Sequence, residues 1–306
     1  VTDIGENAFT KETLIGITLP DSVTEISDGY KFKNNNTIRY ISGNGVVTIG
    51  SYNFSNMSGI RYVDFPNLET IGSSAFRQSS TLISLNFPKL KTIGNNAFMY
   101  TQIFEFVGPE VIDVGLNAFA YCNSLDKVYL PKAENITNKR GSVFTSSSIA
   151  DLYMPNIKAI PLRFCENTIL VKADFPNAES IASSSFQYCN YLKYTNLPKI
   201  TDIPENAFIS NMSYLNTTTI REYYLDNVVT IGENAFAGCT NLTNVVIPET
   251  VNSIGDGAFN CTGLNSIYIY NAETEIFDSA DTLKCSAIYG FPNSTAEDYA
   301  DKYGIE

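Results

Sequence analysis

The chain has 306 residues, a formal net charge of −12 and a sequence pI of about 4.5, an acidic balance that disfavours nucleic acids and anionic membrane surfaces as partners. Histidine is absent; without the commonest general base and metal ligand, we expect no enzyme, no metal site and no other cofactor. No apolar run approaches the ~18 residues of a membrane-spanning helix, so we expect no membrane insertion in this segment.

A repeated unit runs from one end of the chain to the other, and its most complete copy is IGENAFAGCTNLTNVVIP at residues 231–248. Prolines close most units, and between Pro66 and Pro198 they are 21 to 24 residues apart. Such a period predicts a solenoid, in which each coil buries its apolar face against its neighbours. We count twelve units over residues 1–271 by their phenylalanines: Phe9, Phe32, Phe54, Phe76, Phe98, Phe119, Phe144, Phe164, Phe186, Phe208, Phe236 and Phe259.

Within each unit the elements follow in one order. A segment of the form Leu-x-x-Val-x-Ile-Pro alternates as a strand does, with Leu242, Val245 and Ile247 pointing inward, and the proline ends the pairing. The Gly-x-x-Ala-Phe motif that follows predicts a helical turn. Stacking such units makes the strands parallel and ~4.8 Å apart. The predicted fold class is α/β: a curved, horseshoe-like solenoid with a parallel strand ladder on one face and short helical or 3₁₀ turns on the other.

Three units depart from the pattern, around Phe32, at residues 138–141 and at residues 211–219. Insertions of this kind lie on the edge of a solenoid, and we interpret them as tolerated surface variation, including the basic pair Lys139 and Arg140. The tail, residues 272–306, also breaks the pattern. Its stretch from Ser294 to Gly304 has the signals of a short helix, and we predict that the tail caps the open end of the stack.

Six cysteines invite a disulfide framework, but the repeat argues against one. Cys122 and Cys189 occupy the same slot ~14 Å apart, and Cys189 and Cys239 ~10 Å apart, beyond the ~7 Å limit for a bridge. Cys239 and Cys261 lie in adjacent coils, so a bridge between them stays open. We expect buried free thiols, and no zinc, because no Cys-x-x-Cys pair exists.

The candidate binding surface is the outward face of the strand ladder, where tyrosine recurs among mixed charges. Tyrosine offers a large contact area with a polar end, as protein interfaces favour, although strand propensity alone also explains it. The outward pairs are Tyr62/Asp64, Ser84/Asn86, Lys127/Tyr129, Asp151/Tyr153, Lys172/Asp174, Tyr194/Asn196, Glu222/Tyr224 and Ser266/Tyr268. The residues predicted to bind a ligand are Tyr129, Asp151, Tyr153, Lys172, Asp174, Tyr194 and Tyr224.

The unit Ile-Gly-x-x-Ala-Phe-x-x-Cys-x-x-Leu-x-x-Val-x-Ile-Pro resembles the BspA-type, or treponemal-type, leucine-rich repeat. The closing stretch IYGFPNSTAEDYADKYGI, residues 288–305, resembles the tail that commonly ends such arrays. This resemblance implies a leucine-rich-repeat solenoid on secreted or cell-surface proteins of host-associated bacteria and some mucosal protists, with members associated with adhesion. It carries over no catalytic residues, since the motif residues maintain the fold.

We therefore expect a non-enzymatic, extracellular or cell-surface interaction module of a bacterial protein. It would bind a host matrix or cell-surface protein, or a glycan, along the concave strand face. The alternative is a structural spacer that carries another domain. We expect the chain to be a monomer.

Overall fold

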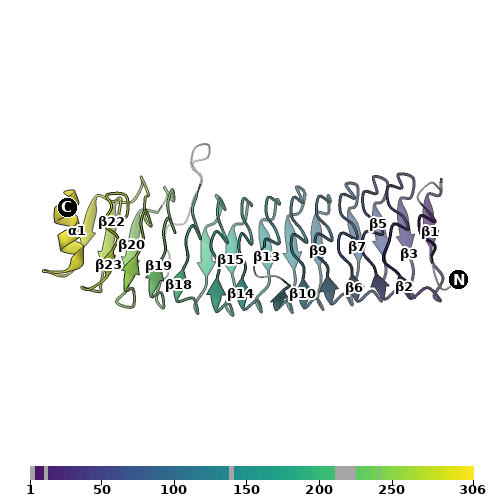
Figure 1. Ribbon diagram of the computed structural model, residues 1–306, viewed down its shortest axis with the longest axis horizontal. Coiled ribbons are helices and arrows are strands. Elements are labelled where there is room, and N and C mark those ends of the chain that lie inside the picture. The colour runs from purple at the N-terminus through teal and green to yellow at the C-terminus, as the bar shows by residue number, and fades with distance from the viewer. Residues whose placement is uncertain (1–3, 10–12, 138–140, 211–224, 241) are drawn as a thin grey trace. The chain divides into compact units, whose positions relative to one another are not determined.

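A computed structural model describes residues 4–9, 13–137, 141–210, 225–240 and 242–306. The chain divides into two compact units, Val1–Asn156 and Ile157–Glu306, and each is described by itself. Both are built from successive coils joined by parallel strand pairs, as Figure 1 shows coil by coil. The predicted parallel-strand solenoid is confirmed.

Strands of three or four residues form what we call the long-strand ladder. In the first unit they form two parallel sheets, β1-β3-β5-β7 and β9-β11-β13; in the second, β15 pairs with β17, and β20-β22-β24 form a sheet. The strands are β1 (Gly16–Thr18), β3 (Tyr40–Ser42), β5 (Tyr62–Asp64), β7 (Ser84–Asn86), β9 (Glu105–Val107), β11 (Lys127–Tyr129), β13 (Asp151–Tyr153), β15 (Lys172–Asp174), β17 (Tyr194–Asn196), β20 (Asn244–Ile247), β22 (Ser266–Ile269) and β24 (Ala287–Tyr289).

Two-residue strands form a second set, the short-strand ladder. In the first unit six of them pair in the order β2-β4-β6-β8-β10-β12; in the second, β14 pairs with β16, and β18-β19-β21-β23 form a sheet. The strands are β2 (Glu25–Ile26), β4 (Thr48–Ile49), β6 (Thr70–Ile71), β8 (Thr92–Ile93), β10 (Asp113–Val114), β12 (Asn135–Ile136), β14 (Ala159–Ile160), β16 (Ser180–Ile181), β18 (Asp202–Ile203), β19 (Thr230–Ile231), β21 (Ser253–Ile254) and β23 (Glu275–Ile276).

The alternation within each long strand decides which side chains enter the core. In β11, Val128 is buried, whereas Lys127 and Tyr129 are exposed. The register places Val128 between Phe106 of β9 and Leu152 of β13, so apolar side chains meet apolar side chains from coil to coil. Each such side chain that is buried contributes roughly 1.5–3 kcal/mol to stability.

The predicted helical or 3₁₀ turns form as single turns rather than as continuous helix: Ala75 N–H donates to the Gly72 carbonyl and Arg77 N–H to the Ser74 carbonyl, each three residues earlier. Ser74 and Phe76 donate their backbone N–H groups to Asn95 and Ala97 of the next coil rather than to a carbonyl four residues earlier. Ser74 also has a φ of 55°, a left-handed conformation that interrupts a helix. Because these donors link neighbouring coils, the motif forms tight turns. The chain's described residues contain a single helix, α1 (Thr295–Tyr303).

Phenylalanines stack along the core of each unit. In the first unit, neighbouring rings from Phe9 to Phe144 have centroids 4.8 to 5.5 Å apart and lie within 15° of parallel. In the second, the rings from Phe186 to Phe259 stack at 5.2 to 5.4 Å. The predicted phenylalanine core is therefore confirmed for these residues, which form a phenylalanine spine within each unit.

Phe164, which we counted as the phenylalanine of its unit, lies one residue before the phenylalanine slot. Cys165 N–H donates to the carbonyl of Ser185, and the Cys165 carbonyl accepts from Cys189 Sγ at 2.9 Å, the bonds that spine phenylalanines make in other coils. Cys165 therefore occupies the phenylalanine slot and Phe164 the preceding alanine slot. Phe164 is still buried and packs edge-on against Phe175, with centroids 5.8 Å apart. Because this coil lacks the Gly-x-x-Ala-Phe motif, its register could not be fixed from the sequence.

The C-terminal segment adds β23, β24 and α1. The side chain of Ser294 accepts the N–H of Glu297 at the start of α1, and Gly304 ends it with a φ of 65°, as the sequence predicted. Tyr299 attaches the helix to the coil before it: its hydroxyl donates to the Ser279 carbonyl at 2.6 Å and accepts the Leu283 N–H at 3.1 Å. A capping function for residues 272–306 stays a prediction.

Candidate interaction surface

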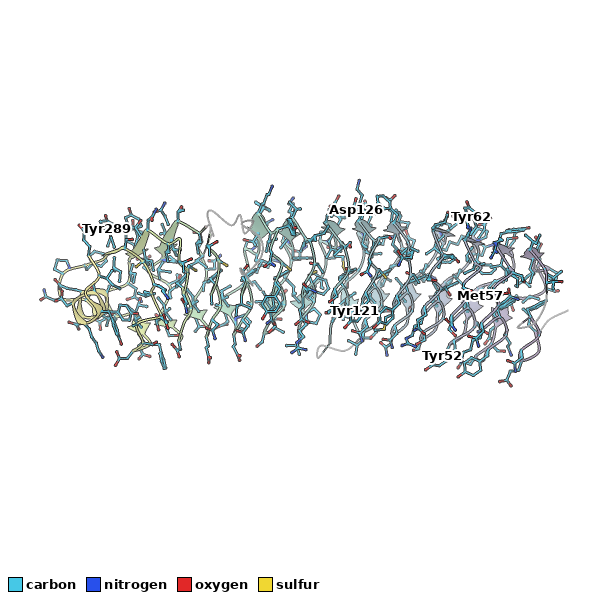
Figure 2. The ribbon with its side chains drawn as sticks, turned by 90° about the horizontal axis from the view of Figure 1, so that it is seen from above. Tyr52, Met57, Tyr62, Tyr121, Asp126 and Tyr289 are labelled. Carbon is cyan, nitrogen blue, oxygen red and sulfur yellow. The ribbon has the colours of Figure 1, made fainter. Side chains whose placement is uncertain are left out.

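The outward side of the long-strand ladder consists of the first and third residues of each three-residue strand. Since the coils repeat in register, each slot forms a row of side chains ~4.8 Å apart. Figure 2 shows Tyr62 and Asp126 along one edge of the first unit, and Tyr52 and Tyr121 along the other. The first unit therefore presents aromatic side chains on two separate edges.

Tyr129 of β11 and Tyr153 of β13 form the most ordered part of the predicted surface. They are register partners, with ring centroids 5.0 Å apart and planes 6° from parallel. Tyr129 is 45% exposed and Tyr153 is 43% exposed, although each ring covers one face of the other. The row beside them alternates in charge, from Glu105 to Lys127 to Asp151. The stacked pair forms an exposed aromatic surface that is bordered by charges of both signs.

In the second unit, Lys172, Asp174 and Tyr194 form another cluster on β15 and β17. Lys172 Nζ lies 2.7 Å from Asp174 Oδ2 and 5.1 Å from the centre of the Tyr194 ring. Asn196 Nδ2 donates to Asp174 Oδ1 at 2.7 Å. Partial burial raises the pKa of the Asp174 carboxyl, but the hydrogen bonds from Lys172 and Asn196 outweigh it and hold that pKa below its usual value. The charges of this cluster are thus satisfied within the protein.

The residues predicted to bind a ligand are divided by the structure. The first unit holds Tyr129, Asp151 and Tyr153, the second holds Lys172, Asp174 and Tyr194, and Tyr224 lies outside the described residues. Ser266, which we expected to be exposed, is buried, and its hydroxyl donates to Asn244 Oδ1 in the adjacent strand. A binding function for any of these residues stays a prediction.

Sequence reasoning missed the tyrosines on the turn edge of the first unit. Tyr100 and Tyr121 stack with centroids 4.8 Å apart, and their φ angles are 62° and 58°. Positive φ is costly for a bulky side chain, and asparagine occupies the same slot at Asn34 and Asn56. The sequence signal for this aromatic edge was a tyrosine in a turn position where other coils have asparagine.

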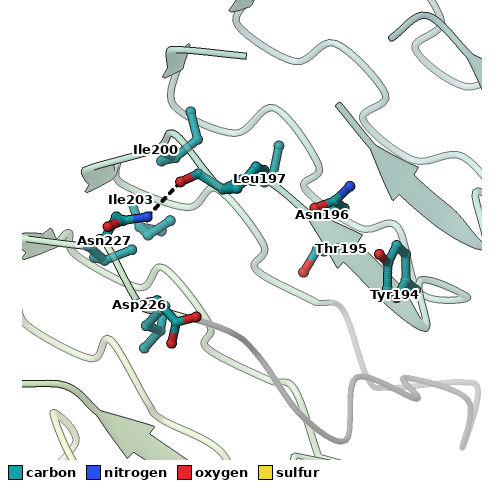
Figure 3. A pocket seen from close by; sticks show the side chains of 11 residues that line it. Tyr194, Thr195, Asn196, Leu197, Ile200, Ile203, Asp226 and Asn227 are labelled. Carbon is teal, nitrogen blue, oxygen red and sulfur yellow. Dashed lines mark hydrogen bonds between the residues drawn. The ribbon is translucent and has the colours of Figure 1, made fainter. Parts of the chain in front are cut away.

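A cavity of about 220 Å³ borders Tyr194 in the second unit. It is lined by β17, by Ile200 and Ile203, and by the turn at residues 225–228, where Asn227 Nδ2 donates to the Pro198 carbonyl at 2.7 Å (Figure 3). Residues 211–224, which precede this turn, lie outside the described part of the chain.

A cleft of about 280 Å³ interrupts the long-strand ladder of the first unit between β7 and β9. The exposed apolar side chains at its mouth include Phe104, 58% exposed, and Val107, 51% exposed. Sequence reasoning missed this cleft as well, although the unit that contains Phe98 is one residue shorter than its neighbour.

The cysteines serve the coil structure. All six are free, so Cys239 and Cys261 are not bridged. The Cys122 thiol donates to the Phe98 carbonyl of the preceding coil at 3.1 Å, and Cys261 donates to Phe236 at 3.0 Å. Burial raises the pKa of Cys122 to about 11 and that of Cys261 to about 12. These thiols stay protonated at neutral pH and are poor nucleophiles.

Among the described residues of the chain, the Cys, Asp and Glu side chains form no group of three or more that could hold a metal ion. None of the helices in this described part has the length and apolar character needed to cross a membrane.

Several solved structures are similar to this chain. A leucine-rich cell surface protein of Faecalibacterium prausnitzii is 22% identical, covering 91% of this chain and 84% of its own, with a TM-score of 0.43. The pneumococcal vaccine antigen PcpA is 18% identical, with coverages of 99% and 82% and a TM-score of 0.47. A leucine-rich repeat protein of Bacteroides ovatus is 19% identical, with coverages of 90% and 92% and a TM-score of 0.41.

Comparison with curated proteins gives no match. The family described as "BspA type Leucine rich repeat region (6 copies)", in contrast, matches residues 1–105, 48–168, 91–214 and 158–287, which together span most of the sequence. The coil structure agrees with that description, with its parallel ladders and buried spine. The chain belongs to the BspA-type leucine-rich repeat family.

Proposed function

We propose that this chain is a non-enzymatic interaction module of a bacterial cell-surface or secreted protein, and that it binds a protein of a host matrix or host cell. The family supports a protein-interaction repeat module, and the similar solved structures include a cell surface protein. The observation that carries the proposal is the exposed stack of Tyr129 and Tyr153 beside Lys127 and Asp151.

The tyrosine pair has the properties of an interface anchor. Each ring is held by its neighbour, so little conformational entropy is left to lose when a partner binds. Tyrosine is also enriched among the few residues that dominate interface energies. Lys127 and Asp151 are exposed beside the rings, where they can select a partner with complementary charges.

A structural spacer is the second candidate, and one observation favours it. Several exposed charges are paired between neighbouring coils, as in Lys91 with Glu69 at 2.9 Å and Lys132 with Glu110 at 2.7 Å. A surface that satisfies its own charges in this way has less need of a partner. Such exposed pairs add little stability, about 0–1 kcal/mol each.

The test is a binding panel of immobilised host matrix proteins and immobilised glycans, probed with the whole chain and with Tyr129→Ala/Tyr153→Ala. We expect saturable binding to at least one protein, lost in the double variant. Tyr268→Ala/Tyr289→Ala is the matched control, because those rings are register partners in the same slots of the second unit and stack at 4.7 Å. Binding to glycans alone would reassign the ligand class, and binding to nothing would favour the spacer.

A further inference from the structure

The cleft between β7 and β9 exposes main-chain groups whose counterparts are paired between β5 and β7. Between β5 and β7, Phe65 N–H donates to the Asn86 carbonyl at 3.2 Å, and Ser84 N–H donates to the Arg61 carbonyl at 3.1 Å. The corresponding bonds across β7 and β9 would run from Phe87 N–H to Val107 and from Glu105 N–H to Ile83. In this fully described stretch neither is formed, and no register pairs the two strands.

The opening is confined to the outward side of these two coils. The short strands beneath it, β8 and β10, pair in register, Thr92 with Asp113 and Ile93 with Val114. The spine is also continuous there, since Phe76 and Phe98 stack at 5.4 Å. The two coils are thus held together along two lines, and the cleft is a fixed feature of their third side.

Three local features of the sequence explain the opening. In one coil, residues 77–81 connect the spine residue Phe76 to the next buried aliphatic residue, Leu82. In the next coil, the connection from Phe98 to Ile103 is one residue shorter and consists of residues 99–102. Phe106, in a slot that holds Leu85 and Val128 in other coils, is a larger side chain that packs between Phe98 at 5.2 Å and Phe119 of the following coil at 4.9 Å. Gly108 supplies no side chain where Phe87 does in the preceding coil.

We propose that this cleft binds an extended peptide segment of a partner protein, which pairs through its main chain with the open edges of β7 and β9. Unpaired N–H and C=O groups along a strand edge are a template for another strand. The free groups lie on both walls, so an extended chain can satisfy donors and acceptors on either side. A flat or globular surface could not reach them.

The side chains around the cleft fit the same occupant. Ile83, Phe104 and Val107 are exposed there and offer apolar contacts to alternate side chains of a strand. A volume of about 280 Å³ corresponds to about nine waters at ~30 Å³ each. This suits a few residues of an extended chain. The site is separate from Tyr129 and Tyr153 and does not depend on the function proposed for them.

The first experiment uses a synthetic peptide that copies residues 59–66, GIRYVDFP, a strand segment of this fold with both charge signs. Its affinity for the whole chain is compared with that of the same peptide N-methylated at alternate residues. We expect N-methylation to weaken binding by more than about tenfold, because it removes main-chain donors and keeps the side chains. Hydrogen exchange should slow on peptide addition at residues 83–87 and 104–107.

Two variants test the site itself. Insertion of one serine between Thr101 and Gln102 restores the length of the neighbouring coil, and should protect the same amides without peptide and abolish peptide binding. Val107→Ser should weaken binding by about fivefold through lost apolar contact. Val246→Ser is its matched control, because Val246 occupies the same slot, is similarly exposed, and lies in the paired strand β20.

The outcomes separate clearly. Slowed exchange at the two cleft segments, together with weak binding of the N-methylated peptide, supports the proposal. Equal affinity of both peptides, protection at other segments, or no binding at millimolar peptide would overturn it. If the insertion variant fails to fold, Val107→Ser and its control still decide. Peptide binding should be unchanged in Tyr129→Ala/Tyr153→Ala, since neither side chain lines the cleft. Loss of a host protein's binding in that variant would concern the tyrosine surface alone.

Discussion

Individual side chains in this fold belong to two classes with different consequences on mutation. Spine residues such as Phe119 are fully buried and touch the same residue type in both adjacent coils. Outward residues such as Tyr129 contact their register partners and solvent. Substitution of the first class should change stability, and substitution of the second should change binding alone.

Phe119→Ala tests the first class. The ring stacks on Phe98 and Phe144 at 5.4 and 5.5 Å, so its loss removes buried area and leaves a cavity that rigid neighbours cannot fill. We expect the free energy of unfolding to fall by about 3–5 kcal/mol. Chemical denaturation measures it, with the exposed Phe104→Ala as control. A Phe119→Ala protein that unfolds at the wild-type midpoint would show that the spine is misread.

The free thiols give a second prediction at this scale. Labelling of the denatured chain without reductant should modify all six cysteines, because none is bridged. In the folded chain at pH 8 only Cys285, which is partly exposed, should react at a measurable rate. Mass spectrometry counts the labels. Detection of a disulfide in the freshly purified protein would contradict this prediction.

The same thiols imply a stability that depends on alkaline pH. Burial raises the pKa of Cys122 to about 11 and that of Cys189 to about 12, from the ordinary thiol value of 9.0. The folded state therefore holds these protons more tightly than the unfolded state. Their contribution is complete below pH 9 and is lost as pH rises toward 12. Unfolding measured from pH 8 to 11 should show a smaller loss of stability in Cys122→Ser than in wild type.

At the scale of elements, the repeat made most of the fold predictable. A regular repeat along the sequence requires parallel strands. The alternation of apolar residues within the most complete copy correctly predicted that Leu242, Val245 and Ile247 are buried. The turns were harder, because a short Gly-x-x-Ala-Phe motif is compatible with a helix until the neighbouring coil competes for its N–H groups. Phe164 was misplaced by one residue because its coil lacks the Gly-x-x-Ala-Phe motif that sets the register elsewhere: proline stands in the glycine slot and Phe164 itself in the alanine slot.

The surface was less predictable than the core. Stacking of Tyr129 on Tyr153 followed from equal slots in adjacent coils. The pairing of Lys172 with Asp174 depends on side-chain rotamers that no period specifies. The β7–β9 cleft arises from one missing residue, and its effect depends on where Phe106 packs. Exceptions to the repeat therefore had to be seen in three dimensions.

The attachment of α1 gives a prediction for one element. Tyr299→Phe removes the hydroxyl that donates to Ser279 and accepts from the buried Leu283 N–H. Leaving those groups unsatisfied should cost about 1–3 kcal/mol. Hydrogen exchange should rise first in residues 279–303, with less change in coils farther along the chain. Tyr303→Phe, whose hydroxyl bonds to the exposed Asp278, serves as control. Equal effects of the two substitutions would contradict this attachment.

For the whole molecule, the repeat separates the requirements of folding from those of binding. Each coil is stabilised mainly by its nearest neighbours, so a substitution inside one coil should destabilise the adjacent coils more than distant ones. The outward rows are free to vary without altering that core. A net charge of −12 keeps the chain soluble and favours partners that are not themselves strongly acidic.

The most direct test of this separation measures stability and affinity on the same proteins. For a ligand found in the binding panel, dissociation constants and melting temperatures are compared among wild type, Tyr129→Ala/Tyr153→Ala, and Lys139→Ala/Arg140→Ala, a pair outside the described residues. We predict unchanged melting in all three, and affinity more than about tenfold weaker only in the tyrosine variant. Affinity that survives the tyrosine change and falls with the basic pair would show that an edge loop binds the ligand.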